Sequence, residues 1–215
     1  MKNLLYKEFR LVIHPMYFLV ALTAALLLIP QWPYFIAMMY IFFITMPNLF
    51  SGGKAQNDIG FTVMLPVRKG DVVRARVLSV VVLELIQIAL SAVFAMLNLT
   101  LYRVENFLLD PNIAFFGLTF IMYGLFNVIF FPMFYKSAQK IGMPTLTAVI
   151  AIILYAVAVE IAVPLLPEVK YVLDGINGDA LVRQLLVLAA GIAVFALLTW
   201  LACRVSVKRF EKVDL

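Results

Sequence analysis

Long apolar runs separated by short polar junctions are the main feature of this chain. Six runs can be distinguished, at residues 16–29, 34–50, 77–102, 113–135, 145–166 and 185–203. Most of them approach the roughly 20 residues that an α-helix needs to cross the hydrocarbon core of a bilayer. Gly, Pro, Asn and charged residues mark the junctions. The pattern therefore predicts an all-α integral membrane protein with six transmembrane helices, in a single domain that covers residues 1–215.

Residues 1–14 have a different, amphipathic pattern. At helical spacing one face carries polar residues and the opposite face apolar ones, with Glu8 as the exception. The polar residues are Asn3, Lys7, Arg10 and His14, and the apolar ones are Leu5, Phe9, Val12 and Met16. This pattern favours a short helix lying in the membrane interface before the first span. The alternative is one continuous span from about residue 11, kinked at Pro15.

Composition narrows the class further. The chain is 65% hydrophobic and only 13% charged, with a mean hydropathy of +1.03, whereas soluble domains hold roughly 45–50% apolar and about 25% charged residues. Cys203 is the only cysteine and His14 the only histidine, so no intrachain disulfide and no Cys/His metal site is expected. The net charge of +5 comes from cations at helix ends, which suits anionic membrane lipid better than nucleic acid.

The distribution of Lys and Arg predicts the orientation. Fourteen of the 17 lie on one side of the predicted bundle. They are Lys2, Lys7, Arg10, Lys54, Arg68, Lys69, Arg74, Arg76, Lys136, Lys140, Arg204, Lys208, Arg209 and Lys212. The other side carries Arg103, Lys170 and Arg183. Because cytosolic loops are enriched in Lys and Arg, a multi-pass protein with both termini in the cytosol is expected.

The stretch 51–76 is the only long polar interruption on the basic side. It combines cations with the apolar residues Phe61, Met64 and Leu65, which a simple connecting loop would not need. We predict a helix at about residues 54–65 that ends before Pro66, with these apolar residues filling a groove of a partner. Lys54, Arg68 and Lys69 would lie on the rim. Asp71 is expected to be the N-cap of the helix that continues into the third span.

Catalytic chemistry is poorly represented. Gly53-Lys54 is not a phosphate-binding loop, because Asn48 replaces its first Gly and Ala55 its Ser or Thr. An embedded enzyme would have to use Glu84 or Glu160, and neither has a second acid or a His beside it in the spans. No catalytic residue is therefore assigned, and the chain is not expected to be an enzyme.

Glu84 belongs to a polar stripe on one face of the third span. The stripe consists of Glu84, Gln87, Ser91 and Asn98. A charged group near mid-membrane should face the bundle interior or water, so this stripe is a candidate substrate path. The alternative is that it forms hydrogen bonds between helices and fixes their packing. Glu160 lies near the outer end of the fifth span, from where it could simply reach the lipid headgroups.

The loop contains the motif of a known family. Asn57-Asp58, followed by Leu65-Pro66-Val67-Arg68-Lys69-Gly70-Asp71-Val72-Val73, resembles the loop of small bacterial ABC type-2 transporter permeases. Lys7-Glu8-Phe9 before the first span is also similar to that family, and the six-span layout covers the whole chain. Arg68 stands where relatives commonly have Ser.

The resemblance implies a membrane subunit of an ATP-binding-cassette transporter in the bacterial cytoplasmic membrane. The loop would be the coupling helix that docks on a separate ATPase. Its residues would include Asn57, Asp58, Phe61, Met64, Leu65, Pro66, Arg68, Lys69 and Asp71. Two ATPase copies, holding ATP and Mg, and a second permease, identical or homologous, are the implied partners, with no cofactor in this chain. Such permeases export peptides, antibiotics, lipids or other amphiphiles. The main alternative is a stand-alone secondary carrier or channel.

Overall fold

The computed structural model describes residues 2–102, 108–137, 140–173 and 178–212. Every regular element within these ranges is helical. The α-helices are α1 (Lys2–Lys7), α2 (Met16–Val20), α3 (Tyr34–Tyr40), α4 (Met46–Ala55), α5 (Asp58–Met64), α6 (Lys69–Leu101), α7 (Ile113–Lys136), α8 (Gly142–Leu165), α9 (Pro167–Leu173) and α10 (Gly178–Phe210). Two π-helical segments, η1 (Glu8–Val12) and η3 (Ile41–Thr45), and one 3₁₀ segment, η2 (Ala21–Leu28), complete the order.

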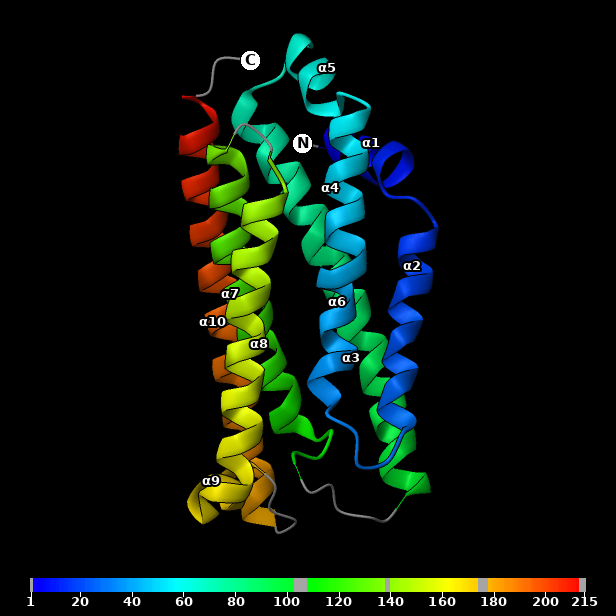
Figure 1. Ribbon diagram of the computed structural model, residues 1–215, viewed down its shortest axis with the longest axis vertical. Helices are drawn as coiled ribbons and strands as arrows, with labels where there is room; N and C mark the ends of the chain where they lie inside the picture. The colour runs from blue at the N-terminus through cyan, green and yellow to red at the C-terminus, as the bar shows by residue number, and fades with distance from the viewer. Residues whose placement is uncertain (1, 103–107, 138–139, 174–177, 213–215) are drawn as a thin grey trace.

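Within the described residues, five helices are long and apolar enough to cross a membrane. They are Tyr34–Ala55, which joins α3, η3 and α4, and Lys69–Leu101, Ile113–Lys136, Gly142–Leu165 and Asp179–Phe210. Figure 1 shows them running along the long axis of one bundle. All backbone polar groups of a span must be satisfied within the helix, which is why such apolar runs become helices. The expected all-α membrane fold is confirmed.

The N-terminal segment is bent rather than continuous. Lys2–Val12 and Met16–Leu28 meet at an angle of 77°, with Pro15 at the junction. This geometry separates an N-terminal helix from the first apolar segment. Counted as one broken span, the bent pair brings the candidate spans among the described residues to six. The second part is short, but the eight residues of η2 rise by about 2.0 Å each instead of 1.5 Å. Together with α2 it spans roughly 24 Å, most of a hydrocarbon core of about 30 Å.

The broadest contact between two helices of the described chain is that of α7 with α10. The two backbones approach closely because glycines face each other. A Cβ built at Gly117 would lie 2.6 Å from the carbonyl oxygen of Val187, and one at Gly191 would overlap the carbonyl of Gly117. Aromatic rings fill the other side of α7, where Phe42 stacks on Phe126 with ring centroids 4.0 Å apart. This packing holds the spans as one body.

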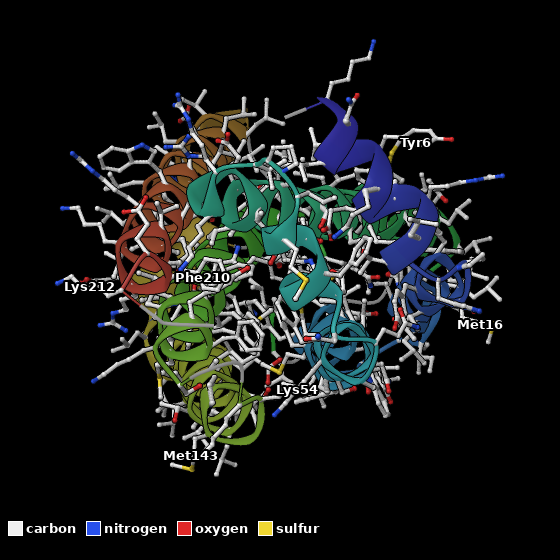
Figure 2. The ribbon with its side chains drawn as sticks, turned by 90° about the horizontal axis from the view of Figure 1, so that it is seen from above. Tyr6, Met16, Lys54, Met143, Phe210 and Lys212 are labelled. Carbon is white, nitrogen blue, oxygen red and sulfur yellow. The ribbon has the colours of Figure 1, made fainter. Side chains whose placement is uncertain are left out.

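The helices α1 and α5 and the last turns of α10 lie at the same end of the bundle, and α9 lies at the other (Figure 1). We call the first of these the basic end, because the Lys and Arg residues of α1, of the start of α6 and of the end of α10 gather there. Figure 2 looks down on it and shows Lys54 and Lys212. Lys170 and Arg183 belong to the opposite end, in α9 and the start of α10. Arg103 lies outside the described residues.

Candidate functional site

The polar stretch of residues 51–76 comprises the end of α4, the short helix α5 and the start of α6. The helix α5 lies at the tip of the basic end (Figure 1). The expected helix at residues 54–65 is wrong in its start, because α4 continues to Ala55 and α5 begins only at Asp58. Asn57 separates them in the left-handed conformation, with φ of 48°, which Asn tolerates better than most residues. A Cβ at Gly60 would lie 2.5 Å from the Asn57 side-chain oxygen. The sharp turn therefore needs Asn57 and Gly60 together.

Large apolar side chains on this segment point away from the bundle. Phe61 is 63% exposed, Met64 84% and Leu65 43%. Pro66 and Arg68 are also exposed, and Lys69 is half-buried. Clustered apolar side chains outside the membrane spans mark an interaction surface more often than chance. Phe61, Met64 and Leu65 therefore form an exposed apolar knob with basic neighbours.

Ion pairs tie α5 to two other parts of the chain. Asp58 Oδ2 lies 2.5 Å from Arg76 Nη2 on α6, and Asp58 Oδ1 lies 2.7 Å from Lys7 Nζ on α1. Arg76 Nε in turn lies 2.5 Å from Glu8 Oε2 at the start of η1. Lys7 Nζ is 3.3 Å from Glu8 Oε1 and donates to Thr62 Oγ1 at 2.8 Å. We call Lys7, Glu8, Asp58 and Arg76 the ion-pair network.

The network is buried. The side chains of Arg76 and Glu8 are both 2% exposed, and that of Asp58 is 13% exposed. The Phe50 ring lies 5.6 Å from the Arg76 guanidinium, and a Cβ at Gly53 would lie 3.2 Å from its Nη1. Buried charges are tolerated only when paired, and here two acids face two bases. Removing one member therefore leaves its partners uncompensated in a site that water barely reaches.

The sequence pattern predicts only part of this network. It assigns Asp58 to the coupling segment, but it treats Lys7 and Arg76 as orientation charges and Glu8 as an exception to an amphipathic pattern. The available signal was Glu8 itself, an acid on a face otherwise apolar. Such a residue needs a cation from elsewhere in the fold, and the structure supplies Arg76, 68 positions later.

The expected N-cap role of Asp71 is wrong. The helix α6 begins at Lys69, its N-cap is Arg68, and no side chain caps it. Asp71 lies in the first turn, 3.1 Å from Arg74 Nη1 three residues on. An acid in a first turn still favours the helix through the dipole. The helix itself runs unbroken for 33 residues, from beside α5 to the far end of the bundle.

The polar stripe of α6 faces the bundle interior. Glu84 accepts a hydrogen bond from Asn127 Nδ2 on α7 at 3.1 Å, and the same nitrogen lies 3.2 Å from Thr199 Oγ1 on α10. Glu84 is fully buried, and its second oxygen has no hydrogen-bond partner among the described residues. Three helices thus meet at one polar cluster. Removing Glu84 or Asn127 would alter how α6, α7 and α10 fit.

The rest of the stripe contacts the first two apolar segments. Gln87 Nε2 donates to the Ala37 carbonyl at 3.4 Å, and Asn98 Nδ2 to the Leu27 carbonyl at 2.6 Å. Ser91 is buried with no hydrogen-bond partner for its hydroxyl in the described part of the chain. Glu160 on α8 is only partly buried and accepts from the backbone amide of Phe35. Gln87 and Asn98 therefore make hydrogen bonds between helical segments, while the substrate path stays a prediction.

Comparison with known proteins identifies the family of this chain. No curated protein and no solved structure matches the chain significantly. A family profile described as ABC-2 family transporter protein matches residues 3–211, almost the whole chain. The match includes the ion-pair network, α5 and all the apolar helices. The chain therefore belongs to the ABC-2 family of transporter proteins and is a multi-pass membrane subunit of a transporter.

Proposed function

We propose that this chain is the export permease of an ATP-binding-cassette transporter whose ATPase is a separate chain, and that α5 is its coupling helix. The observation that carries the proposal is a contrast between the side chains of α5. Phe61 and Met64 are exposed, whereas Asp58 is paired with Arg76 and Lys7. A segment built this way suits docking on a partner while remaining attached to the bundle.

The attachment supplies a route for movement. A partner that pulls or tilts α5 acts on Arg76 through Asp58, and thereby directly on α6. Because α6 is one helix of about 50 Å, its displacement reaches Glu84 and Asn98 without an intervening loop. Lys7 and Glu8 carry the same displacement to the N-terminal helix. The two helices would move together as the ATPase closes.

The remaining parts of the proposal follow from the family and from charge. The basic end would face the bacterial cytosol, as the bias of Lys and Arg favours, and the ATPase would meet it there. Two ATPase copies with ATP and Mg, and a second permease, identical or homologous, would complete the transporter. The cargo would be a peptide, an antibiotic or another amphiphile. Glu84, Gln87, Ser91 and Asn98 stay candidate path residues. Cargo would reach Glu84 only if α6 separates from α7, and Gln87 and Asn98 only if α6 separates from α3 and η2.

Cross-linking tests the docking site directly. A photo-reactive amino acid at Met64 should cross-link to the co-expressed ATPase, because this side chain is 84% exposed on α5. The matched control is Tyr171 on α9, which is 60% exposed at the opposite end. Cross-links from Tyr171 and none from Met64 would overturn both the docking site and the orientation.

A further inference from the structure

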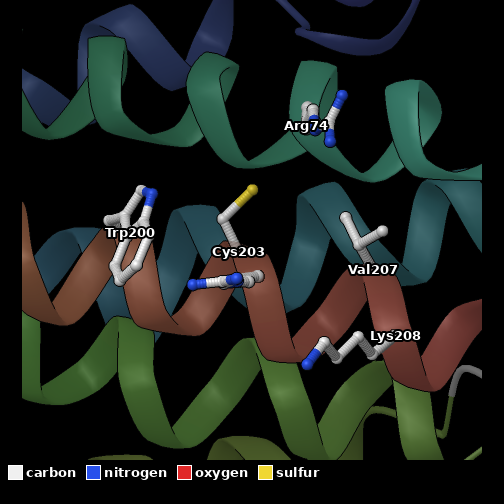
Figure 3. A pocket seen from close by; sticks show the side chains of 6 residues that line it. Arg74, Trp200, Cys203, Val207 and Lys208 are labelled. Carbon is white, nitrogen blue, oxygen red and sulfur yellow. The ribbon is translucent and has the colours of Figure 1, made fainter.

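A pocket between α6 and α10 at the basic end is not used by the coupling site. Its volume is about 480 Å³. Figure 3 shows Arg74 on α6 across from Trp200, Cys203 and Val207 on α10, with Lys208 farther from Arg74 on the same helix. Its lining residues are Arg74, Trp200, Cys203, Arg204, Val207 and Lys208. Three of the six are cations and none is an acid.

The charge of this pocket is only partly balanced. Asp71 pairs with Arg74 at 3.1 Å, and Glu211 Oε1 would lie 3.6 Å from a Cβ at Gly70, beside the pocket. No salt bridge joins Arg204 or Lys208 to an acid among the described residues. Arg204 instead lies over the Trp200 ring, 5.1 Å from its centroid. The pocket therefore offers cationic donors to an anion.

An apolar surface continues from the pocket toward the middle of the bundle. Leu197, Trp200, Arg204 and Lys208 recur at steps of three, four and four, which puts them on one face of α10. Leu197 is 55% exposed and Trp200 53% exposed. On α6, Leu78 lies one turn beyond Arg74 and is 42% exposed. Cations at the end and apolar side chains along the span match the two halves of an amphiphile.

We infer that this pocket binds the phosphate headgroup of an anionic phospholipid, whose acyl chains lie along Leu197 and Leu78. Basic pockets between helices at the end of a bundle are a recognised arrangement for acidic headgroups. Trp200 fits because aromatic rings favour the membrane–water interface. A free phosphate ion would use the cations and leave the apolar wall unused, so the lipid is the occupant that both halves of the site favour.

Fluorescence of Trp200 gives a direct test. Trp32 and Trp200 are the only tryptophans, so Trp32→Phe leaves a single reporter in the pocket. The protein is reconstituted in phosphatidylcholine with a fixed fraction of brominated phosphatidylglycerol or of brominated phosphatidylcholine. Stronger quenching by the anionic lipid is expected. Arg204→Gln and Lys208→Gln should each weaken that preference about fivefold, whereas Lys212→Gln, which removes the same charge outside the pocket, should leave it unchanged.

Four results would overturn the inference. The first is equal quenching by the two brominated lipids. The second is a preference for the anionic lipid that persists in the double variant Arg204→Gln, Lys208→Gln. The third is a preference that disappears when millimolar inorganic phosphate is added, because the site would then bind the free anion. The fourth is that neither lipid quenches Trp200 until the protein is diluted, which would mean that a second copy covers this face. The transporter proposal stands or falls separately, because none of these readouts involves an ATPase.

Discussion

Asp58 and Arg76 are joined by an oxygen–nitrogen distance of 2.5 Å, although one belongs to an exposed surface helix and the other is almost completely buried. This contact connects the part of the chain that we expect to meet an ATPase with α6, an apolar helix of 33 residues. Glu8 holds the same guanidinium from the N-terminal side. A single side chain thus joins three segments, and its removal should affect stability and coupling together.

Arg76→Gln should destabilise the protein by about 3–5 kcal/mol, because Glu8 and Asp58 would stay buried with Lys7 alone to balance two acids. Adding Glu8→Gln to this variant should restore part of the loss. Thermal unfolding in detergent, followed for the two single variants and the double variant, measures the coupling. Strictly additive effects would show that Glu8 and Arg76 do not interact.

Asp58→Ala and Asp71→Ala should behave differently, although both remove an acid from the same loop. Asp58→Ala removes the ion pairs of α5 with Arg76 and Lys7 and leaves only the hydrogen bond from Lys7 to Thr62 among the described polar contacts with these two residues, so ATP hydrolysis should no longer be linked to transport. Asp71 makes only a partly exposed ion pair with Arg74, so its loss should cost roughly 1 kcal/mol or less and leave coupling intact. ATP turnover and transport measured together in proteoliposomes compare the two. Equal uncoupling by both variants would exclude a special role for the Asp58–Arg76 contact.

Phe61→Ala should weaken ATPase docking about ten- to hundred-fold, as expected for one large apolar side chain that is buried on binding. The thermal stability of the permease alone should not change, because Phe61 is 63% exposed. The affinity of the permease for the ATPase is compared by measuring how much ATPase co-purifies at increasing salt and dilution. If Phe61→Ala, Met64→Ala and Leu65→Ala together leave co-purification unchanged, α5 is not the docking helix.

Glu84→Gln and Glu84→Leu should distinguish a role of Glu84 in helix packing from a role in transport. Gln keeps a group that accepts from Asn127, so folding should be nearly unaffected. Leu removes the charged one of the two acceptors of the Asn127 amide and leaves it only Thr199, which should cost about 1–3 kcal/mol. Transport and thermal stability are measured on both variants. A change in transport with Glu84→Gln at unchanged stability supports a place on the cargo path, and unaltered transport assigns Glu84 to packing alone.

Gly191→Ala should destabilise the bundle by about 1–3 kcal/mol, because its new methyl group would overlap the Gly117 carbonyl and push α7 from α10. Gly142→Ala is the matched control, since a Cβ there meets nothing within 4 Å. Thermal unfolding should therefore show a loss for Gly191→Ala and no loss for Gly142→Ala. A stable Gly191→Ala protein would mean that the α7–α10 contact is looser than described.

Local physics makes much of this fold predictable from the sequence. Apolar runs such as residues 113–135 and 145–166 have to be helices in a bilayer, because hydrocarbon offers their backbone no other hydrogen-bond partner. The helical period by itself also places Glu84, Gln87, Ser91 and Asn98 on one face of the third span. The exposed apolar knob at Phe61 and Met64 follows from the same kind of argument, since polar connections rarely need such side chains.

The three-dimensional structure decided the long-range pairings. Nothing in the local pattern says that Arg76 pairs with Glu8 and Asp58 rather than with Asp71, which is closer in sequence. The hydrophobic pattern also did not predict the left-handed turn at Asn57 or the start of α6 at Lys69. Both features position Asp58 beside Arg76. Ion pairing depends on distance in space and on burial, whereas helical periodicity constrains only neighbours along one helix. The sequence alone therefore determined which segments are helices, and only tertiary packing decided which charges hold them together.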